Sequence, residues 1–155
     1  MEIFLTVVLI IAAIIAAYIT VATNTVKIKK IPVSSPKIPK EFDGVKIALL
    51  SDLHDAKLSG YSKKKLLEKT AEIKPDFIFL GGDMHEIRKK DKKFFSLLDD
   101  LKKIAPLYYV DGNHDARLKK YPDYKNYLAE LEKRAENLHG KTSLCIGNAK
   151  IDLYG

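Results

Sequence analysis

The sequence predicts an α/β domain that follows an N-terminal membrane-spanning helix. Residues 3–23 form an apolar stretch without a single charge. Behind it, short apolar runs alternate with longer segments whose apolar residues recur at helical spacing. Such alternation is typical of a parallel sheet covered by helices. With 155 residues, the chain has room for one domain of ordinary size beside the helix.

The apolar stretch, IFLTVVLIIAAIIAAYITVAT, is long enough to cross a bilayer, because its 21 residues span roughly 31 Å at ~1.5 Å per residue. A cleaved signal peptide usually begins with basic residues, whereas Glu2 precedes this stretch. We therefore expect an uncleaved transmembrane helix over residues 1–23, with a cleaved signal peptide as the alternative. Five lysines lie in residues 24–44 and none precedes the helix, so the positive-inside rule predicts a cytoplasmic C-terminal domain.

Residues 24–44 are predicted to form an extended linker, because three prolines and two serines fall between Ile31 and Pro39. The net charge of +7 predicts attraction to anionic lipid headgroups and to phosphorylated substrates. Basic residues are dispersed and Trp is absent, so no specific nucleic-acid partner is predicted. The single Cys145 excludes an intramolecular disulfide and is expected to be a small apolar core residue.

The domain, residues 45–155, is predicted to have the element order β-α-β-α-β-α followed by a hairpin. Right-handed crossovers of this kind build a parallel sheet. The stretch TSLCIGNAKIDLYG predicts two short strands that turn at Gly147-Asn148. The predicted strands are residues 45–50, 75–81 and 106–112, and the predicted helices are residues 62–73, 91–104 and 122–138.

Polar residues with ligand chemistry stand at the end of the first predicted strand, in SDLHDAK. On an extended chain, Asp52 and His54 point to the same side, because side chains alternate with period two. Such a pair could orient a proton, satisfy a loop, or hold a metal ion through oxygen and nitrogen.

The second and third strands end in the same way. LGGDMHE supplies Asp83, and VDGNHDAR supplies Asn113, His114 and Asp115. In an open α/β sheet, ligands collect outside the carboxyl ends of the strands. Three strands that deliver oxygen or imidazole donors to one edge predict a binding site there.

The order D-x-H, G-D and G-N-H-D resembles the calcineurin-like metallophosphoesterase family, over residues 45–155. With the apolar helix and the linker, the chain is similar to the bacterial, membrane-anchored branch of that family. The resemblance implies the first half of a calcineurin-like αββα sandwich and a centre of two divalent metal ions. Asp52 and His54 would bind one ion, Asp83 would bridge both, and Asn113 would bind the second.

The resemblance also implies that His114 is a substrate-facing acid or phosphate-stabilising group, oriented by Asp115. Carboxylate, amide and imidazole donors favour Mn, Fe or Zn over Mg. The implied activity is a membrane-anchored, metal-dependent phosphoric ester hydrolase. Because the chain is tethered, a lipid-linked or envelope-derived ester is the expected substrate class.

The chain departs from the family in one respect. Family members carry a second half with an isolated His and a G-H-x-H motif, and neither motif occurs in these residues. His85 and His139 are the remaining histidines, and both are expected at the surface. We expect an incomplete chain; the alternative is a catalytically inactive, membrane-bound remnant that acts as a binding or scaffold module. The chain lacks G-x-G-x-x-G after the first strand and lacks a Walker A pattern, so a nucleotide-binding domain is disfavoured.

Overall fold

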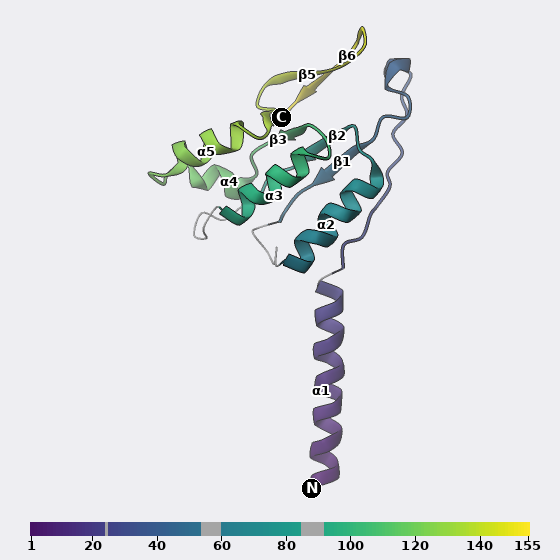
Figure 1. Cartoon of the computed structure of the whole chain (residues 1–155), viewed down its shortest axis with the longest axis vertical. Coiled ribbons are helices and arrows are strands. Elements are labelled where there is room, and N and C mark those ends of the chain that lie inside the picture. The colour runs from purple at the N-terminus through teal and green to yellow at the C-terminus, as the bar shows by residue number, and fades with distance from the viewer. Residues whose placement is uncertain (24, 54–59, 85–91) are drawn as a thin grey trace.

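One long helix, α1 (Glu2–Thr23), extends away from a domain built from the rest of the chain (Figure 1). The structure is a computed structural model, and it describes residues 1–23, 25–53, 60–84 and 92–155. Residues Glu2–Thr20 have the length and apolar composition to cross a membrane, and none of this window is buried against the domain. These properties agree with the predicted anchor, and a signal sequence near an N-terminus has them as well.

The domain is built on a four-stranded parallel sheet in the order β1-β2-β3-β4. Each strand therefore pairs with its neighbour in the sequence, and the carboxyl ends of all four lie along one edge. This arrangement confirms the predicted fold class. The strands are β1 (Ile47–Leu50), β2 (Phe77–Leu80), β3 (Leu107–Tyr109) and β4 (Glu136–Asn137).

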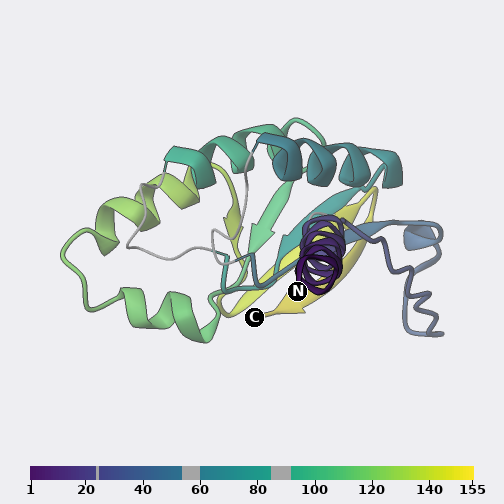
Figure 2. The same cartoon turned by 90° about the horizontal axis from the view of Figure 1, so that it is seen from below.

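Helices cover one face of this sheet and form the hydrophobic core with it. Figure 2 shows α2 (Gly60–Ile73) and α3 (Lys92–Lys102) side by side along that face. Alternate strand residues point toward the helices, which explains why Ile78 and Leu80 are fully buried whereas their neighbours are only half-buried. Further along the chain, α5 (Tyr124–Glu132) packs against α3 through aromatic rings, with Phe94 and Tyr127 stacked at 6.3 Å.

The other face of the sheet is also apolar but less covered. On β1, Leu49 is 68% exposed, and the rings of Phe79 and Tyr108 meet edge to face at 5.6 Å on the neighbouring strands. The antiparallel hairpin of β5 (Lys141–Ile146) and β6 (Ala149–Tyr154) lies on this side of the sheet (Figure 2). β1 is an edge strand of the four-stranded sheet.

The first three strands lie where the sequence predicted them, but each is shorter than its predicted range. The hairpin is also present, and its turn falls at Gly147-Asn148 as predicted. The third predicted helix, residues 122–138, was wrong at its end, because α5 stops at Glu132 and the chain then forms β4 beside β3. A short helix, α4 (Asn113–Leu118), was not predicted. Cys145 is exposed on β5 and is therefore not the core residue that we expected.

Candidate functional site

The carboxyl ends of β1 and β2 are held together by backbone hydrogen bonds that continue past the strands. The Gly81 N–H donates to the Leu50 carbonyl at 2.7 Å, and the Asp52 N–H donates to the Gly82 carbonyl at 3.1 Å. Asp52 and the loop that carries Asp83 consequently lie next to each other at the edge of the sheet. This is the edge at which three strand ends were predicted to converge.

The loop after β2 is joined to the start of α4 by side chains that accept backbone hydrogen bonds in both directions. Asp83 Oδ1 accepts from the His114 N–H at 2.8 Å. In return, Asp115 Oδ2 accepts from the Asp83 N–H at 2.7 Å and from the Gly112 N–H at 2.8 Å. We call these three bonds the β2–α4 clasp. The clasp fixes the Asp83 carboxylate and the backbone of the Gly112-Asn113-His114 segment relative to one another.

The backbone at this edge adopts conformations that residues with a Cβ seldom accept. Asp52 and Asp83 have φ angles of 55° and 53°, in the left-handed region, which Asp tolerates better than most residues. Gly82, with φ 86°, approaches the next loop so closely that a Cβ built on it would lie 2.5 Å from Gly112 N. A Cβ built on Gly112 would in turn lie 2.5 Å from Asp83 N. Strain of this kind concentrates at functional sites.

Asp115 is the buried acid of the site. Its side chain is 5% exposed, and Oδ1 is a buried polar atom that has no hydrogen-bond partner among the described residues. Burial raises the pKa of Asp115, the backbone N–H groups of Gly112 and Asp83 oppose that rise, and the nearby Asp111 carboxylate adds to it. Asp115 thus stabilises two loops at the expense of desolvating its own carboxyl group.

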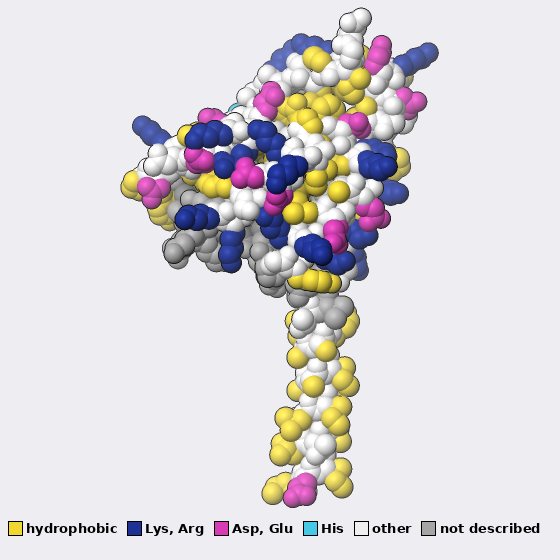
Figure 3. All heavy atoms as spheres, in the orientation of Figure 1, with side chains coloured by type: hydrophobic (Ala, Val, Ile, Leu, Met, Phe, Trp, Pro, Cys, Tyr) yellow, Lys and Arg dark blue, Asp and Glu magenta, His cyan; other side chains and the backbone are white. Residues whose placement is uncertain are grey.

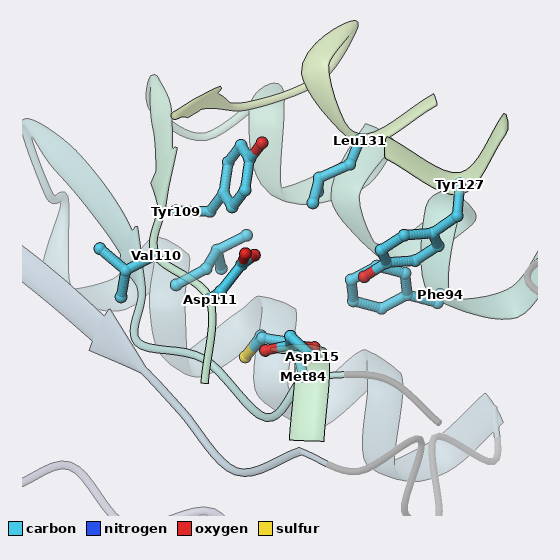
Figure 4. Close-up of a pocket in the computed structure, with 9 residues that line it drawn as sticks. Met84, Phe94, Tyr109, Val110, Asp111, Asp115, Tyr127 and Leu131 are labelled. Carbon is cyan, nitrogen blue, oxygen red and sulfur yellow. The ribbon is translucent and has the colours of Figure 1, made fainter. Parts of the chain in front are cut away.

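A cavity of about 10 Å³ lies beside Asp115. Figure 4 shows the Asp111 carboxylate pointing into the space between Tyr109 and the Phe94 ring, with Asp115 and Met84 together below it. The volume is at the lower limit of what holds one water molecule. The cavity is too small for a substrate, so a phosphate ester would have to approach the exposed rim of the site.

Sequence reasoning missed one pair at this edge. His139 Nε2 lies 2.9 Å from Asp111 Oδ2, and Lys119 Nζ lies 3.6 Å from the same oxygen. His139 is exposed, as predicted, yet it adjoins the residue that immediately precedes Gly112-Asn113. The position of Asp111 directly before G-N-H-D was the available signal for it.

The predicted site residues differ in their exposure to solvent. Asp52 and Asn113 are exposed at the edge, Asp83 and His114 are half-buried, and Asp115 is buried. The hydroxyl of Ser51 donates to Asp52 Oδ2. His54 and His85 lie outside the described residues. The structure brings Asp83, His114 and Asp115 together in the β2–α4 clasp, and the role of Asp115 in orienting the His114 ring stays a prediction.

The side chains at this edge carry donor atoms of the type that bind divalent cations. Two carboxylates and one amide oxygen suit a hard or borderline metal ion, and the exposed positions of Asp52 and Asn113 give an ion access. Among residues 1–23, 25–53, 60–84 and 92–155, no group of three His, Cys, Asp or Glu side chains is close enough to hold a metal. The imidazole predicted to complete the first position belongs to His54, outside those ranges.

Comparison with known proteins assigns the domain that carries this site to a family. The family model described as calcineurin-like phosphoesterase matches residues 45–154. A Danio rerio protein named transmembrane protein with metallophosphoesterase domain is 29% identical over 150 residues, which cover 92% of this chain and 32% of that protein. Proteins from two strains of Helicobacter pylori, each named uncharacterized metallophosphoesterase, are 34% identical over 91 residues, which cover 57% of this chain and 24% of each relative. The matched segment thus covers only a third or a quarter of the length of these relatives.

Proposed function

The chain belongs to the calcineurin-like phosphoesterase family, and from that premise we propose that it is part of a membrane-anchored phosphoric ester hydrolase that uses two divalent metal ions. The observation that carries the proposal is the β2–α4 clasp, which holds Asp83 beside the start of α4. The hydrolase activity is proposed for the whole protein, since the chain matches only part of its relatives.

Four residues would hold the ions: Asp52 and His54 the first, Asp83 both, and Asn113 the second. Asp83 supports this role because one of its oxygens is engaged by the His114 N–H, which fixes the direction of the carboxylate. Two bound ions, whether Mn, Fe or Zn, would polarise the phosphate oxygens and acidify a bound water. Asp52 is adjacent in space through its hydrogen bond to the Gly82 carbonyl.

His114 would act on the substrate side. It is the second residue of α4, directly after the proposed metal ligand Asn113, and it is half-buried. The imidazole would donate a proton or a hydrogen bond to the leaving-group oxygen of the ester. Asp115 would serve as a positioning residue, because its carboxylate accepts hydrogen bonds from the backbone N–H groups of Asp83 and Gly112.

The membrane location would bring the site to lipid-linked or envelope-derived esters. In Figure 1, β1 runs toward the side of the domain from which α1 leaves, so its carboxyl end faces the anchor. A substrate whose phosphate protrudes from the bilayer surface would therefore meet this edge. Five lysines in residues 24–44 support a cytoplasmic domain by the positive-inside rule.

The test measures metal content and hydrolysis together in the full-length protein. We expect close to two divalent ions per protein and cleavage of an aryl phosphate ester in Mn²⁺ buffer. No more than trace metal in the full-length protein would contradict the proposal and favour a non-catalytic, membrane-bound binding module.

Residues 1–155 alone provide a second arm of the test. We expect this chain to insert into membranes and to hydrolyse the ester weakly or not at all, because the four proposed ligands are too few for two ions. Strong, chelator-sensitive hydrolysis by residues 1–155 would require another ligand. His85, two residues after Asp83, would be the first residue to substitute.

A further inference from the structure

Asp111 connects the sheet to the segment that carries Asn113, the proposed ligand of the second ion. Pairing of this segment with β2 ends one residue earlier, where the Val110 N–H donates to the Leu80 carbonyl at 3.0 Å. The next backbone N–H with a partner in the described part of the chain is that of Gly112, which belongs to the β2–α4 clasp. Whatever holds Asp111 between these two points therefore influences where Asn113 lies.

A series of side-chain contacts from the end of β4 holds Asp111. Asn137 Nδ2 donates to the Tyr109 hydroxyl at 2.8 Å, and Asn137 Oδ1 accepts from the His139 N–H at 2.6 Å. The His139 ring then contacts Asp111 Oδ2 through Nε2, at 2.9 Å. We call these four residues the Asp111 tether. Because Tyr109 is the last residue of β3 and Asp111 follows two residues later, the tether holds both ends of this short segment.

The environment of the Asp111 carboxylate makes it a fixed point. Its side chain is 13% exposed, and Figure 4 shows the carboxylate in the space between Tyr109 and the Phe94 ring. A carboxylate with so little access to water is stable where it accepts hydrogen bonds, so its position depends on its donors. The contacts lie on the helix-covered face of the sheet, since α3 supplies Phe94 and α5 supplies Leu131 to the same cavity.

Two donors adjoin Asp111 Oδ2, and they differ in how firmly they can hold it. Lys119 Nζ lies 3.6 Å away on a flexible, exposed side chain, which makes a weak and screened ion pair. Figure 3 shows Lys and Arg interspersed with Asp and Glu over the helices that face the viewer, so the surrounding charge is mixed in sign. The rigid His139 ring, at 2.9 Å, is the donor that sets the direction of the carboxylate.

We propose that His139 is a positioning residue of the metal site. By holding Asp111, it fixes the backbone of Asn113 relative to Asp83. Loss of the ring frees the segment after β3 and weakens the ion that Asn113 binds, while the first ion stays in place. The part of this inference that concerns ions rests on the proposed function, whereas the hold on the segment does not.

The test uses the full-length protein and four variants. His139→Ala removes the ring, and His139→Asn replaces it when the Ala variant does not fold. His139→Gln carries an amide N–H at about the reach of Nε2, whereas the amide of His139→Asn is too short to reach Asp111. Lys119→Gln removes the other cation beside the same oxygen and is the matched control. The His139 side chain is 45% exposed, so these changes open no cavity in the core.

Amide hydrogen exchange of the metal-free protein, followed by mass spectrometry, measures the hold on the segment. We expect peptides that cover residues 110–118 to exchange about two- to tenfold faster in His139→Ala and His139→Asn, the net contribution of one hydrogen bond. Exchange should stay near wild type in His139→Gln and in Lys119→Gln. Peptides from α2 should exchange equally in all variants.

Calorimetric titration with Mn²⁺ measures the consequence for the site. We expect the wild-type protein to bind two ions, and His139→Ala to weaken one of them by about tenfold while the affinity for the other is unchanged. His139→Gln should restore the weakened ion. A general structural defect would instead lower both affinities together with the urea midpoint of unfolding.

Several results would overturn the proposal. Equal exchange in the wild type and in His139→Ala would show that the tether holds nothing, and a Gln variant that behaves like Ala would exclude the Nε2 contact. Equal effects of Lys119→Gln and His139→Ala would assign the effect to charge instead of position. Equal weakening of both ions, or of neither, would remove the positioning role. A wild-type protein that binds no Mn²⁺ would contradict the hydrolase proposal, and exchange alone would then decide whether His139 holds the segment.

Discussion

Gly82 and Gly140 offer a matched pair for measuring how closely the β2 and β3 loops must approach. Both have a φ of 86°, so an Ala at either position carries the same backbone strain. A Cβ on Gly140 would meet nothing within 4 Å, whereas a Cβ on Gly82 would lie 2.5 Å from Gly112 N and 2.6 Å from Gly112 Cα. The difference between Gly82→Ala and Gly140→Ala therefore isolates the close approach.

The left-handed backbone costs an Ala about 1–2 kcal/mol at either position. Only Gly82→Ala must also move the Gly112 backbone, by about 0.9 Å, from 2.5 Å to an ordinary contact of 3.4 Å. That movement would stretch the 2.7 Å bond from the Asp83 N–H to Asp115 Oδ2 to about 3.6 Å, beyond hydrogen-bonding distance. One or two lost bonds to a charged group cost about 1.5–3 kcal/mol each, so we expect Gly82→Ala to be less stable than Gly140→Ala by about 1.5–6 kcal/mol.

Urea unfolding of the detergent-solubilised chain, followed by circular dichroism, would measure the free energy of unfolding of each variant. Mn²⁺ titration by calorimetry would show whether the same change weakens ion binding, which we expect for Gly82→Ala and not for Gly140→Ala. Equal unfolding free energies in the two variants would refute the reasoning, because the close contact would then contribute nothing.

Three further predictions concern single side chains. In an active full-length protein, His114→Ala should lower turnover by ~10²-fold or more while metal content stays near wild type. Asp83→Ala should instead lose both ions. Equal metal loss in the two variants would mean that His114 is a ligand. Burial raises the pKa of Tyr109 to about 12, so its neutral form stabilises the fold fully below its usual pKa of 10, and this contribution is lost as the pH rises through 12. Ultraviolet titration of tyrosinate should therefore show a late step that Tyr109→Phe removes, and an unchanged curve would contradict the assignment. Exposed Cys145, the only cysteine, should resist a membrane-impermeant maleimide in intact cells and react after lysis, and labelling of intact cells would place the domain outside.

The predicted parallel strands and the hairpin could be recognised from the sequence because their apolar runs are short and bounded by turn residues. The end of α5 could not be recognised, because local helix propensity continues through residues 133–138. The segment after α5 instead pairs with a strand that is distant in the sequence: β4 lies beside β3, and directly after β4 the Leu138 N–H donates to the Tyr109 carbonyl at 2.8 Å. α4 was missed because six residues are too few to show a helical period.

The sequence indicates which strand ends carry ligand-type residues, but it does not indicate how these residues are connected. Strand ends mark Asp52, Asp83 and Asn113, since a parallel sheet brings such ends to one edge. No local pattern reveals that the carboxylate of Asp115 accepts from an N–H 32 residues away. Nor does one reveal the pair of Asp111 and His139, which only the paired strands β3 and β4 bring together.

The strand order β1-β2-β3-β4 has a consequence for synthesis on the ribosome. From β2 onward, each strand pairs with the one made just before it, so its partner is already present when it is translated. Ile47 meets Phe77, and Ile78 meets Leu107, each about thirty residues later. These four strands can therefore assemble vectorially while the nascent chain is still attached, in the same order in which Asp52, Asp83 and Asn113 emerge. Residues 1–110 should accordingly show protease-resistant β1 and β2 on stalled ribosomes before the G-N-H-D segment is made.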